Sequence, residues 1–424
     1  MSDVLTSIEA IGEYMPYPPY ISRERIFGYE KNLKRFKGTY NDGKFIRIKN
    51  LNGGVDRFPL ITENYFKLIT LKLQGLLLNE KPIISYKNDV NLSKILNGVV
   101  DDSGFWRAFL AAFRNFSALG TGVLYLSCNE QGPVVNSVNP GHLFKIVNPQ
   151  NIDEITCYIL VQPIFKVNYK EYSYTQIEKL RVLYHFKSYY IEKVFKYNEN
   201  GQILNCESEQ RYETGLNDFA VFCFENCPPT DEVFGYSDYD SISDIVLLYE
   251  QTLTLVNAVL IKNINPILQV PTGTFTENEQ TGKLEAPTDG SAVEVDAGAA
   301  ELKYINYDLQ ITDIMNYLTS LLNELGIQSE MSKTFLTGEF AANLSGEAIK
   351  SLLKSPMDKI SRSIDELDYV VKALFVQMLH LVGIECSVSD VVITWRDGIA
   401  GTTDDVQAEP TEIIETDEGG VLSE

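Results

Sequence analysis

The feature that most constrains the fold is a long segment, Asp240–Asn265, that carries no charge between Glu250 and Lys262 and stops at Pro266. Ser241, with Asp244 three residues later, predicts the start of a helix, because a hydroxyl can cap a free N–H and a carboxylate favours that helix end. Proline disfavours helical backbone before it and has no N–H, so Pro266 predicts the end. The segment therefore predicts a helix about 38 Å long.

This helix is apolar on two sides. One strip, with steps of three and four residues, contains Ile242, Ile245, Val246, Tyr249, Leu253, Val256 and Leu260. A second strip contains Leu247, Leu248, Leu255 and Val259. Such a helix is typical of the core of one globular domain, and equally of a helix that packs against copies of itself in a ring. Periodicity alone leaves both interpretations open.

A second apolar helix follows after an insert. Its spacing again steps by three and four residues, and its apolar positions are Ile311, Ile314, Met315, Leu318, Leu321, Leu322 and Leu325. Gly326 is expected to end this helix, since glycine is favoured just past a helix C-terminus. The insert contains three short strand candidates, at 267–270, 292–295 and 302–305. We therefore expect two helices with a small mixed module between their far ends.

The chain before this pair predicts mixed structure. Arg23–Phe36 is a basic amphipathic helix that could lie on phosphate, on an acidic neighbour or in solvent. Two more helices are expected at Leu60–Leu78 and Trp106–Leu119, and the region 134–225 has the Ile, Val, Tyr and Phe content of antiparallel strands. The predicted fold class is α+β.

The chain after the pair begins with a segment that lacks periodicity. Gln328–Asn343 contains Gly338 and is expected to form a mobile loop. Ser345–Val382 then predicts a long helix with a kink or break near Pro356. A last strand is expected at Val391–Trp395, and the acidic residues after Gly398 predict a disordered tail.

Charge and composition limit the function. The 36 Lys and Arg residues stand against 58 Asp and Glu, a net charge of −22, which argues against a tight general nucleic-acid binder. A protein that nucleic acid must slide past is still allowed. No secretory signal pattern and no apolar run of about eighteen residues is found, so no membrane span is expected. The 6 cysteines have no framework spacing and are expected to be reduced thiols.

Motifs of catalysis are absent from the sequence. The three histidines, His142, His185 and His380, lie in unrelated segments. The chain has no GxxxxGK[ST] loop, no GxGxxG after a strand and no GxSxG elbow. We therefore expect no enzyme activity, no cofactor and no metal site, although residues distant in sequence could still converge in space.

The order of these parts resembles the portal proteins of tailed bacteriophages and related viruses. The resemblance covers most of residues 22–400 and rests mainly on the order of elements. The segments that carry it are GYSDYDSISDIVLLYEQTLTLVNAV at Gly235–Val259, LSGEAIKSLLKSP at Leu344–Pro356, the long helix that follows, and VVITWRDGI at Val391–Ile399. None of these is a catalytic signature, and their shared order is more specific than any one of them.

The resemblance implies a division of the chain into parts. An N-terminal arm (1–21) would precede a mixed α/β wing (22–237). A stem of two helices (238–265 and 307–327) would enclose a small clip (266–306). A channel loop (328–344) would lead into a long kinked wing helix with a terminal strand (345–400), followed by an acidic tail (401–424). Little sequence remains for the helical crown of such proteins, so a crown would be short or absent.

The resemblance also implies a function. Such subunits form a ring, usually of twelve, at one capsid vertex of the virion, and are assembled in the host cytoplasm. Double-stranded DNA is packaged and ejected through the ring without sequence specificity. The implied partners are further copies of the chain, the terminase large subunit, the major capsid or scaffold protein and a neck adaptor protein. The alternatives are another ring-forming connector or channel-type structural protein and, in a different class, a nucleic-acid-processing hydrolase.

Three groups of site residues follow from this interpretation. The expected DNA-facing residues of the channel loop are Lys333, Glu330, Thr334 and Glu339, with Lys333 as the only cation. Stem packing is expected from Ile245, Tyr249, Leu253, Val256, Leu260, Leu318 and Leu322. The clip residues expected to dock a neck component are Thr272, Phe275, Glu277 and Lys283.

Overall fold

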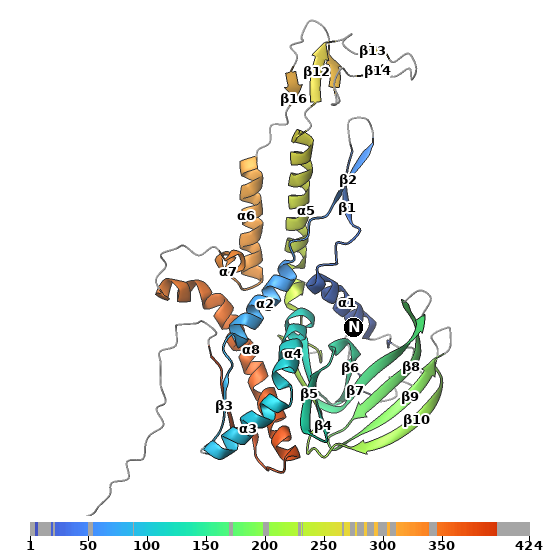
Figure 1. Cartoon of the computed structure of the whole chain (residues 1–424), viewed down its shortest axis with the longest axis vertical. Helices are drawn as coiled ribbons and strands as arrows, with labels where there is room; N and C mark the ends of the chain where they lie inside the picture. The colour runs from blue at the N-terminus through green and yellow to red at the C-terminus, as the bar shows by residue number, and fades with distance from the viewer. Residues whose placement is uncertain are drawn as a thin grey trace, which may run out of the picture.

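A computed structural model gives the fold. The residues it describes are 5–6, 18–19, 22–49, 54–87, 89–168, 173–197, 203–227, 230, 232–264, 267–271, 276–277, 284–285, 292–295, 303–305, 311–338 and 346–396. Within them the chain forms a mixed α/β body from which a pair of long helices projects (Figure 1).

The largest hydrophobic core lies among the helices of the body. It is built by α2 (Tyr65–Leu78), α3 (Val90–Asp102), α4 (Phe105–Leu119) and α8 (Gly346–Leu381). Two small antiparallel sheets complete it. One has the order β11 (Val221–Glu225), β4 (Thr121–Asn129), β5 (Gly132–Ser137), and the other pairs β17 (Val391–Thr394) with β3 (Ile83–Tyr86).

A five-stranded antiparallel sheet forms the other side of the body. Its order is β10 (Ile203–Glu213), β9 (Tyr189–Tyr197), β8 (Ser173–His185), β7 (Asn151–Asn168) and β6 (Leu143–Asn148). A short 3-10 turn, η3 (Pro140–His142), leads into β6. Leu5 makes a parallel bridge to Ile146, so the start of the chain touches the β6 edge. Helix α1 (Arg23–Lys37) contacts α4, α2 and η3.

The projecting pair consists of α5 (Asp238–Ile264) and α6 (Ile311–Gln328), which contact each other. A three-stranded sheet of β15 (Ala292–Val295), β12 (Ile267–Pro271) and β16 (Lys303–Ile305) lies beyond their far ends, with a two-stranded ladder of β13 (Thr276–Glu277) and β14 (Leu284–Glu285) (Figure 1). On the opposite side of α5 from α6 lies an antiparallel ribbon of β1 (Phe45–Lys49) and β2 (Val55–Pro59).

The structure corrects both expected helix signals around this pair. Helix α5 begins at Asp238, and its cap is Ser237, whose Oγ accepts from Tyr239 N at 3.0 Å while the Asp240 carboxylate accepts from Ser237 N at 3.3 Å. Ser241 was therefore the wrong cap. Gly326 does not end α6, which continues to Gln328.

Gly326 has a packing role inside α6. A Cβ at this position would lie 2.7 Å from the Met331 carbonyl oxygen and 3.0 Å from the Lys333 nitrogen. The glycine therefore allows the chain after α6 to fold back against the helix. From its sequence context, this glycine was expected to end the helix.

Two other expectations need correction, and a third is refined. The expected loop Gln328–Asn343 contains a one-turn helix, α7 (Lys333–Thr337), capped by Ser332, whose Oγ accepts from Phe335 N at 3.1 Å. Helix α2 begins at Tyr65, later than expected, because Asn64 caps it by accepting from Lys67 N. Helix α8 is continuous with Pro356 inside it and changes direction along its length (Figure 1), which agrees with the predicted kink and excludes a break.

Candidate channel and assembly surfaces

The two strips of α5 have different environments within one subunit. The first strip packs inward at the base, where Ile242 and Val246 are fully buried, and its predicted packing residues Ile245, Tyr249, Leu253 and Val256 are half-buried farther along. Tyr249 makes an edge-to-face contact with Tyr65 at 5.6 Å between ring centroids. On α6, Leu318 is buried and Leu322 half-buried. These residues join α5 and α6 to each other and to the body.

The second strip of α5 is only partly covered. Leu248 and Leu255, two helical turns apart, are 42% and 43% exposed, whereas Leu247 and Val259 are half-buried. Leu260 of the first strip, a predicted packing residue, is 42% exposed within one subunit. Among the described residues, Asp238–Ile261 is also the one helical stretch apolar and long enough to cross a membrane, by length and composition alone. A helix that packs against neighbouring copies can have the same composition. Clustered apolar side chains on a surface often mark a site of contact with another protein.

The base of the α5–α6 pair is fixed by a buried ion pair. Lys359 Nζ of α8 lies 2.9 Å from Asp238 Oδ1, and the two side chains are only 12% and 6% exposed. The same carboxylate accepts hydrogen bonds from Ser117 Oγ at 2.6 Å and Asn226 Nδ2 at 3.0 Å. The first residue of α5 is thus held by α4, α8 and the segment after β11, and the multiple donors compensate its desolvation.

Helix α8 also clamps the turn that follows α6. Lys359 Nζ donates to the Ser329 carbonyl at 3.3 Å, and Ser355 Oγ donates to the Glu330 carbonyl at 2.9 Å. Arg362 forms an ion pair with the Glu330 carboxylate. Glu330 has φ 59°, a conformation that non-glycine residues rarely adopt, so these contacts stabilise a strained turn.

The segment after this turn is packed onto the body. Met331 and Leu336 are buried in the main core, and Lys72 Nζ of α2 donates to the Phe335 carbonyl at 2.6 Å while lying 4.7 Å from its ring centroid. Residues 329–338 therefore have a defined position. The predicted channel residues Lys333 and Thr334 are half-exposed on α7, whereas the carboxylate of Glu330 forms an ion pair with Arg362. Glu339 lies outside the described residues.

A second joint links α5 to the base of the ribbon. Glu250 is fully buried and accepts hydrogen bonds from the Tyr40 hydroxyl, from Asn41 Nδ2 at 2.8 Å and from Glu63 N at 3.0 Å. One turn later, Thr254 Oγ1 accepts from Ile61 N at 3.0 Å. Burial raises the pKa of the Glu250 carboxyl, and the hydrogen bonds act in the opposite direction. The joint sets the position of the β1–β2 ribbon beside the stem.

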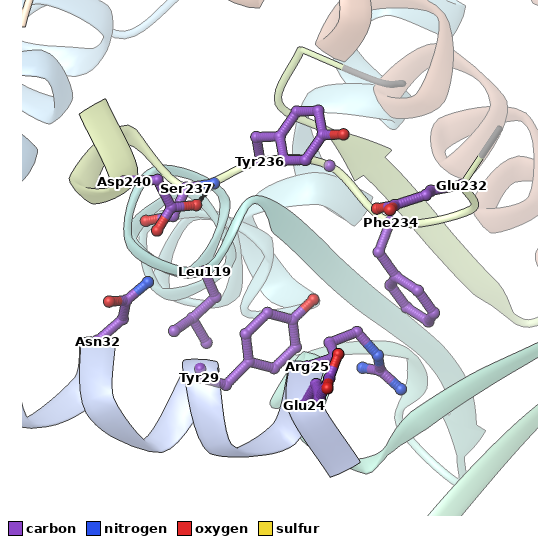
Figure 2. A pocket seen from close by; sticks show the side chains of 12 residues that line it. Glu24, Arg25, Tyr29, Asn32, Leu119, Glu232, Phe234, Tyr236, Ser237 and Asp240 are labelled. Carbon is purple, nitrogen blue, oxygen red and sulfur yellow. Dashed lines mark hydrogen bonds between the residues drawn. The ribbon is translucent and has the colours of Figure 1, made fainter. Parts of the chain in front are cut away.

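The cations of α1 divide into buried and exposed groups. Arg25 lies 3.8 Å from the Phe234 ring centroid and donates to the carbonyls of Pro140 at 3.0 Å and Leu143 at 3.2 Å. It borders a cavity of about 230 Å³ between α1 and the segment entering α5 (Figure 2). Arg35 is buried and donates to Asn32 Oδ1 at 2.8 Å. Both guanidinium groups are held by contacts within the subunit and are therefore not available to an external anion.

The predicted clip residues lie mostly outside the described part of the chain. Thr272, Phe275 and Lys283 cannot be placed, and Glu277 lies in β13, where it pairs with Leu284. The module itself contains strands close to the three ranges expected from the sequence.

Groups that could support chemistry are scattered. In the described ranges, no three His, Cys, Asp or Glu side chains are placed to hold a metal ion. His185 is enclosed between the rings of Tyr125 and Tyr190, at 5.2 and 5.1 Å, and burial lowers its pKa to about 4. Burial also raises the pKa of the Cys223 thiol to about 12, which leaves it protonated and unreactive.

Comparisons with known proteins identify the family to which the chain is similar. The sequence model of the phage portal protein family described as SPP1 Gp6-like matches residues 56–409. Comparison with curated proteins gives no match. Similar solved structures include the neck of a native GTA particle computed with C12 symmetry, at 10% identity and TM-score 0.43, covering 77% of this chain and 79% of that chain. The neck of an empty GTA particle computed with C6 symmetry is similar at 11% identity and TM-score 0.46, covering 92% and 88%.

Proposed function

Because this chain belongs to the SPP1 Gp6-like family of phage portal proteins, it is a virion structural protein that serves genome packaging and ejection, and we propose how its parts perform that role. Copies of the chain form a closed ring, of twelve subunits as the resemblance implies, at one capsid vertex. The stem is α5 with α6, the body is the wing, and the module at 266–306 is the clip. Double-stranded DNA passes along the ring axis.

The main support for the proposed ring is the exposed apolar strip of α5. Leu248 and Leu255 lie on a face that no other described part of the subunit covers fully, while the other face of the same helix is packed. In a ring, the neighbouring subunit covers this second face through a heterologous contact that closes on itself. The contact would remove apolar surface from water in every subunit, so a modest interface gains strength from repetition.

The ring is tested by placing a charge on the strip. Leu255→Asp should prevent assembly, because the contact would bury an unpaired carboxylate. Asn257→Asp, an exposed polar position on the same helix, is the matched control and should assemble normally. Native mass spectrometry and top-view electron microscopy give the oligomer size. Normal rings from Leu255→Asp would refute the stem assignment.

The channel role falls on α7. We assign Lys333 to weak, sequence-independent contact with passing phosphates, which suits a conduit that must release DNA. Since Met331 and Leu336 are core residues, deleting the segment would damage the fold, and single substitutions are the better test. Lys333→Ala should leave rings intact and reduce the DNA retained in heads, with Lys94→Ala, an exposed lysine of α3, as the control. An unchanged amount of DNA retained in heads would show that Lys333 does not contact the passing DNA.

The clip is assigned to docking. It projects beyond the stem (Figure 1), which makes it accessible to a neck adaptor at one end of the ring, while the terminase large subunit docks during packaging. Removing Thr272–Pro287 should preserve rings and abolish attachment of the neck. Completion of normal virions by this deletion would contradict the assignment. The body would contact the major capsid or scaffold protein, and assembly would occur in the host cytoplasm.

A further inference from the structure

The β1–β2 ribbon has one cationic face. Cross-strand pairing places Arg47 opposite Arg57 and Lys49 opposite Val55, so these side chains share a face with Phe45 and Pro59. This face is exposed and carries no carboxylate. The other face, with Ile46, Ile48, Asp56 and Phe58, is partly buried. Like charges directly opposite each other destabilise a strand pair, so the two guanidinium groups gain from an external anion.

The charge of this region is opposite to that of the chain. Residues 31–67 carry nine Lys or Arg against three Asp or Glu, whereas the whole chain has a net charge of −22. A two-stranded ribbon is also marginally stable by itself. This ribbon contacts only α5 closely among the described elements. Its outer face therefore suits a partner surface that is acidic and partly apolar.

Helix α6 offers such a surface. Asp313, Tyr317, Ser320, Glu324 and Ile327 recur at steps of four and three residues, so they form one stripe. All five are exposed, with Tyr317 at 47% and Ile327 at 72%. The helix contains no Lys or Arg. Its stripe thus combines two carboxylates with apolar side chains, which complements the ribbon in both respects.

The two surfaces lie on opposite sides of the subunit. Figure 1 shows α5 between the ribbon and α6, so one subunit cannot bring the two faces together. Two copies placed side by side can, and the contact then repeats in one direction, as a ring requires. We propose that the cationic face of the β1–β2 ribbon of one subunit binds the acidic stripe of α6 on the next. This inference rests on the proposed ring and names a contact that holds it.

The mixed composition distinguishes this partner from nucleic acid. Phe45 and Val55 are 50% and 51% exposed beside the cations, and an apolar surface gains nothing from phosphate. A second copy of the chain supplies carboxylates and apolar groups together, and electrostatic complementarity of this kind fixes orientation and partner choice.

Charge reversal with exchange tests the contact. One variant, Arg47→Glu with Arg57→Glu, reverses the ribbon, and a second, Asp313→Lys with Glu324→Lys, reverses the stripe. Each alone should reduce the ring fraction about tenfold, because like charges would face each other across the contact. Mixed in equal amounts, the two should form rings again, with alternating subunits and equal numbers of each, because every contact then joins opposite charges.

Native mass spectrometry measures both the ring size and the subunit ratio. It is applied to the wild type, to each variant and to the mixture. Lys94→Glu with Arg107→Glu, two exposed cations on α3 and α4, is the matched control and should assemble like the wild type. Circular dichroism checks that each variant is folded. Raising the salt concentration should weaken the wild-type contact and relieve the defect of both reversed variants.

The possible outcomes are distinct. Normal rings from either reversed variant alone would overturn the contact while leaving the ring intact. Failure of the mixture to recover, or recovery with unequal numbers, would overturn α6 as the partner. Absence of rings in the wild type under all conditions would overturn the ring itself, and the proposed contact with it.

Discussion

His185 should make the stability of the five-stranded sheet depend on pH. Its side chain is 0% exposed on β8, and neither ring nitrogen has a hydrogen-bond partner in the described part of the chain. Burial lowers the pKa of the imidazole from about 6.5 in an unfolded chain to about 4. Between these values the unfolded state binds a proton that the folded state does not. Stability is therefore full above pH 6.5 and falls as the pH drops toward 4.

The magnitude follows from the pKa difference. One pKa unit corresponds to about 1.4 kcal/mol, so at pH 4.5 the folded protein should have lost about 2.5 kcal/mol through this group. His185→Phe removes the titration and keeps a ring between Tyr125 and Tyr190. It should match or exceed the wild-type stability at pH 7.5, because it no longer buries unpaired nitrogens.

The assay is urea unfolding of both proteins from pH 7.5 to pH 4.5. The difference between their unfolding free energies should grow in favour of His185→Phe below pH 6.5. Burial also lowers the pKa of His142, but this residue is present in both proteins and cancels in the difference. Parallel curves for His185→Phe would refute the reasoning.

Three further predictions concern the joints of the stem, and thermal unfolding measures each. Gly326→Ala should lower the free energy of unfolding by about 2 kcal/mol, because the added methyl group meets a backbone carbonyl; an unchanged melting temperature would contradict the close approach. Glu250→Leu should cost about 3 kcal/mol, since three donors, of which Asn41 is buried, lose their acceptor, and Glu250→Gln should cost less. Lys359→Met should cost about 3 kcal/mol by leaving Asp238 buried without its cation, whereas Arg362→Met, at an exposed pair, should cost under about 1 kcal/mol. Equal effects of the last two would show that burial does not govern these pairs.

Local patterns predicted much of this fold from the sequence. The two strips of α5, the short strands beyond the stem and the long helix α8 all appear close to their expected ranges, because periodicity and strand propensity act over a few residues. The family resemblance rested on the order of these same elements, and the family match agrees with it.

Contacts between distant residues account for what the sequence did not predict. Gly326 has the sequence context of a helix stop, but its role depends on a chain segment that folds back onto it. The pairing of Lys359 with Asp238 joins residues far apart in sequence, and no local pattern marks it. The β1–β2 ribbon was not expected, since its alternating cations and apolar residues also suit an irregular surface segment.

Pro356 of α8 lies next to the side chains that hold the turn beyond α6. Pro356 cannot donate to the Leu352 carbonyl, so the helix lacks one bond there. Ser355, Lys359 and Arg362 fix the chain at and after this point to the turn beyond α6. The missing bond lowers the resistance of α8 to bending at this point. The part of the helix after Pro356 is anchored in the main core through Ile360 and Leu367, so any bending strain would fall on the part before the proline.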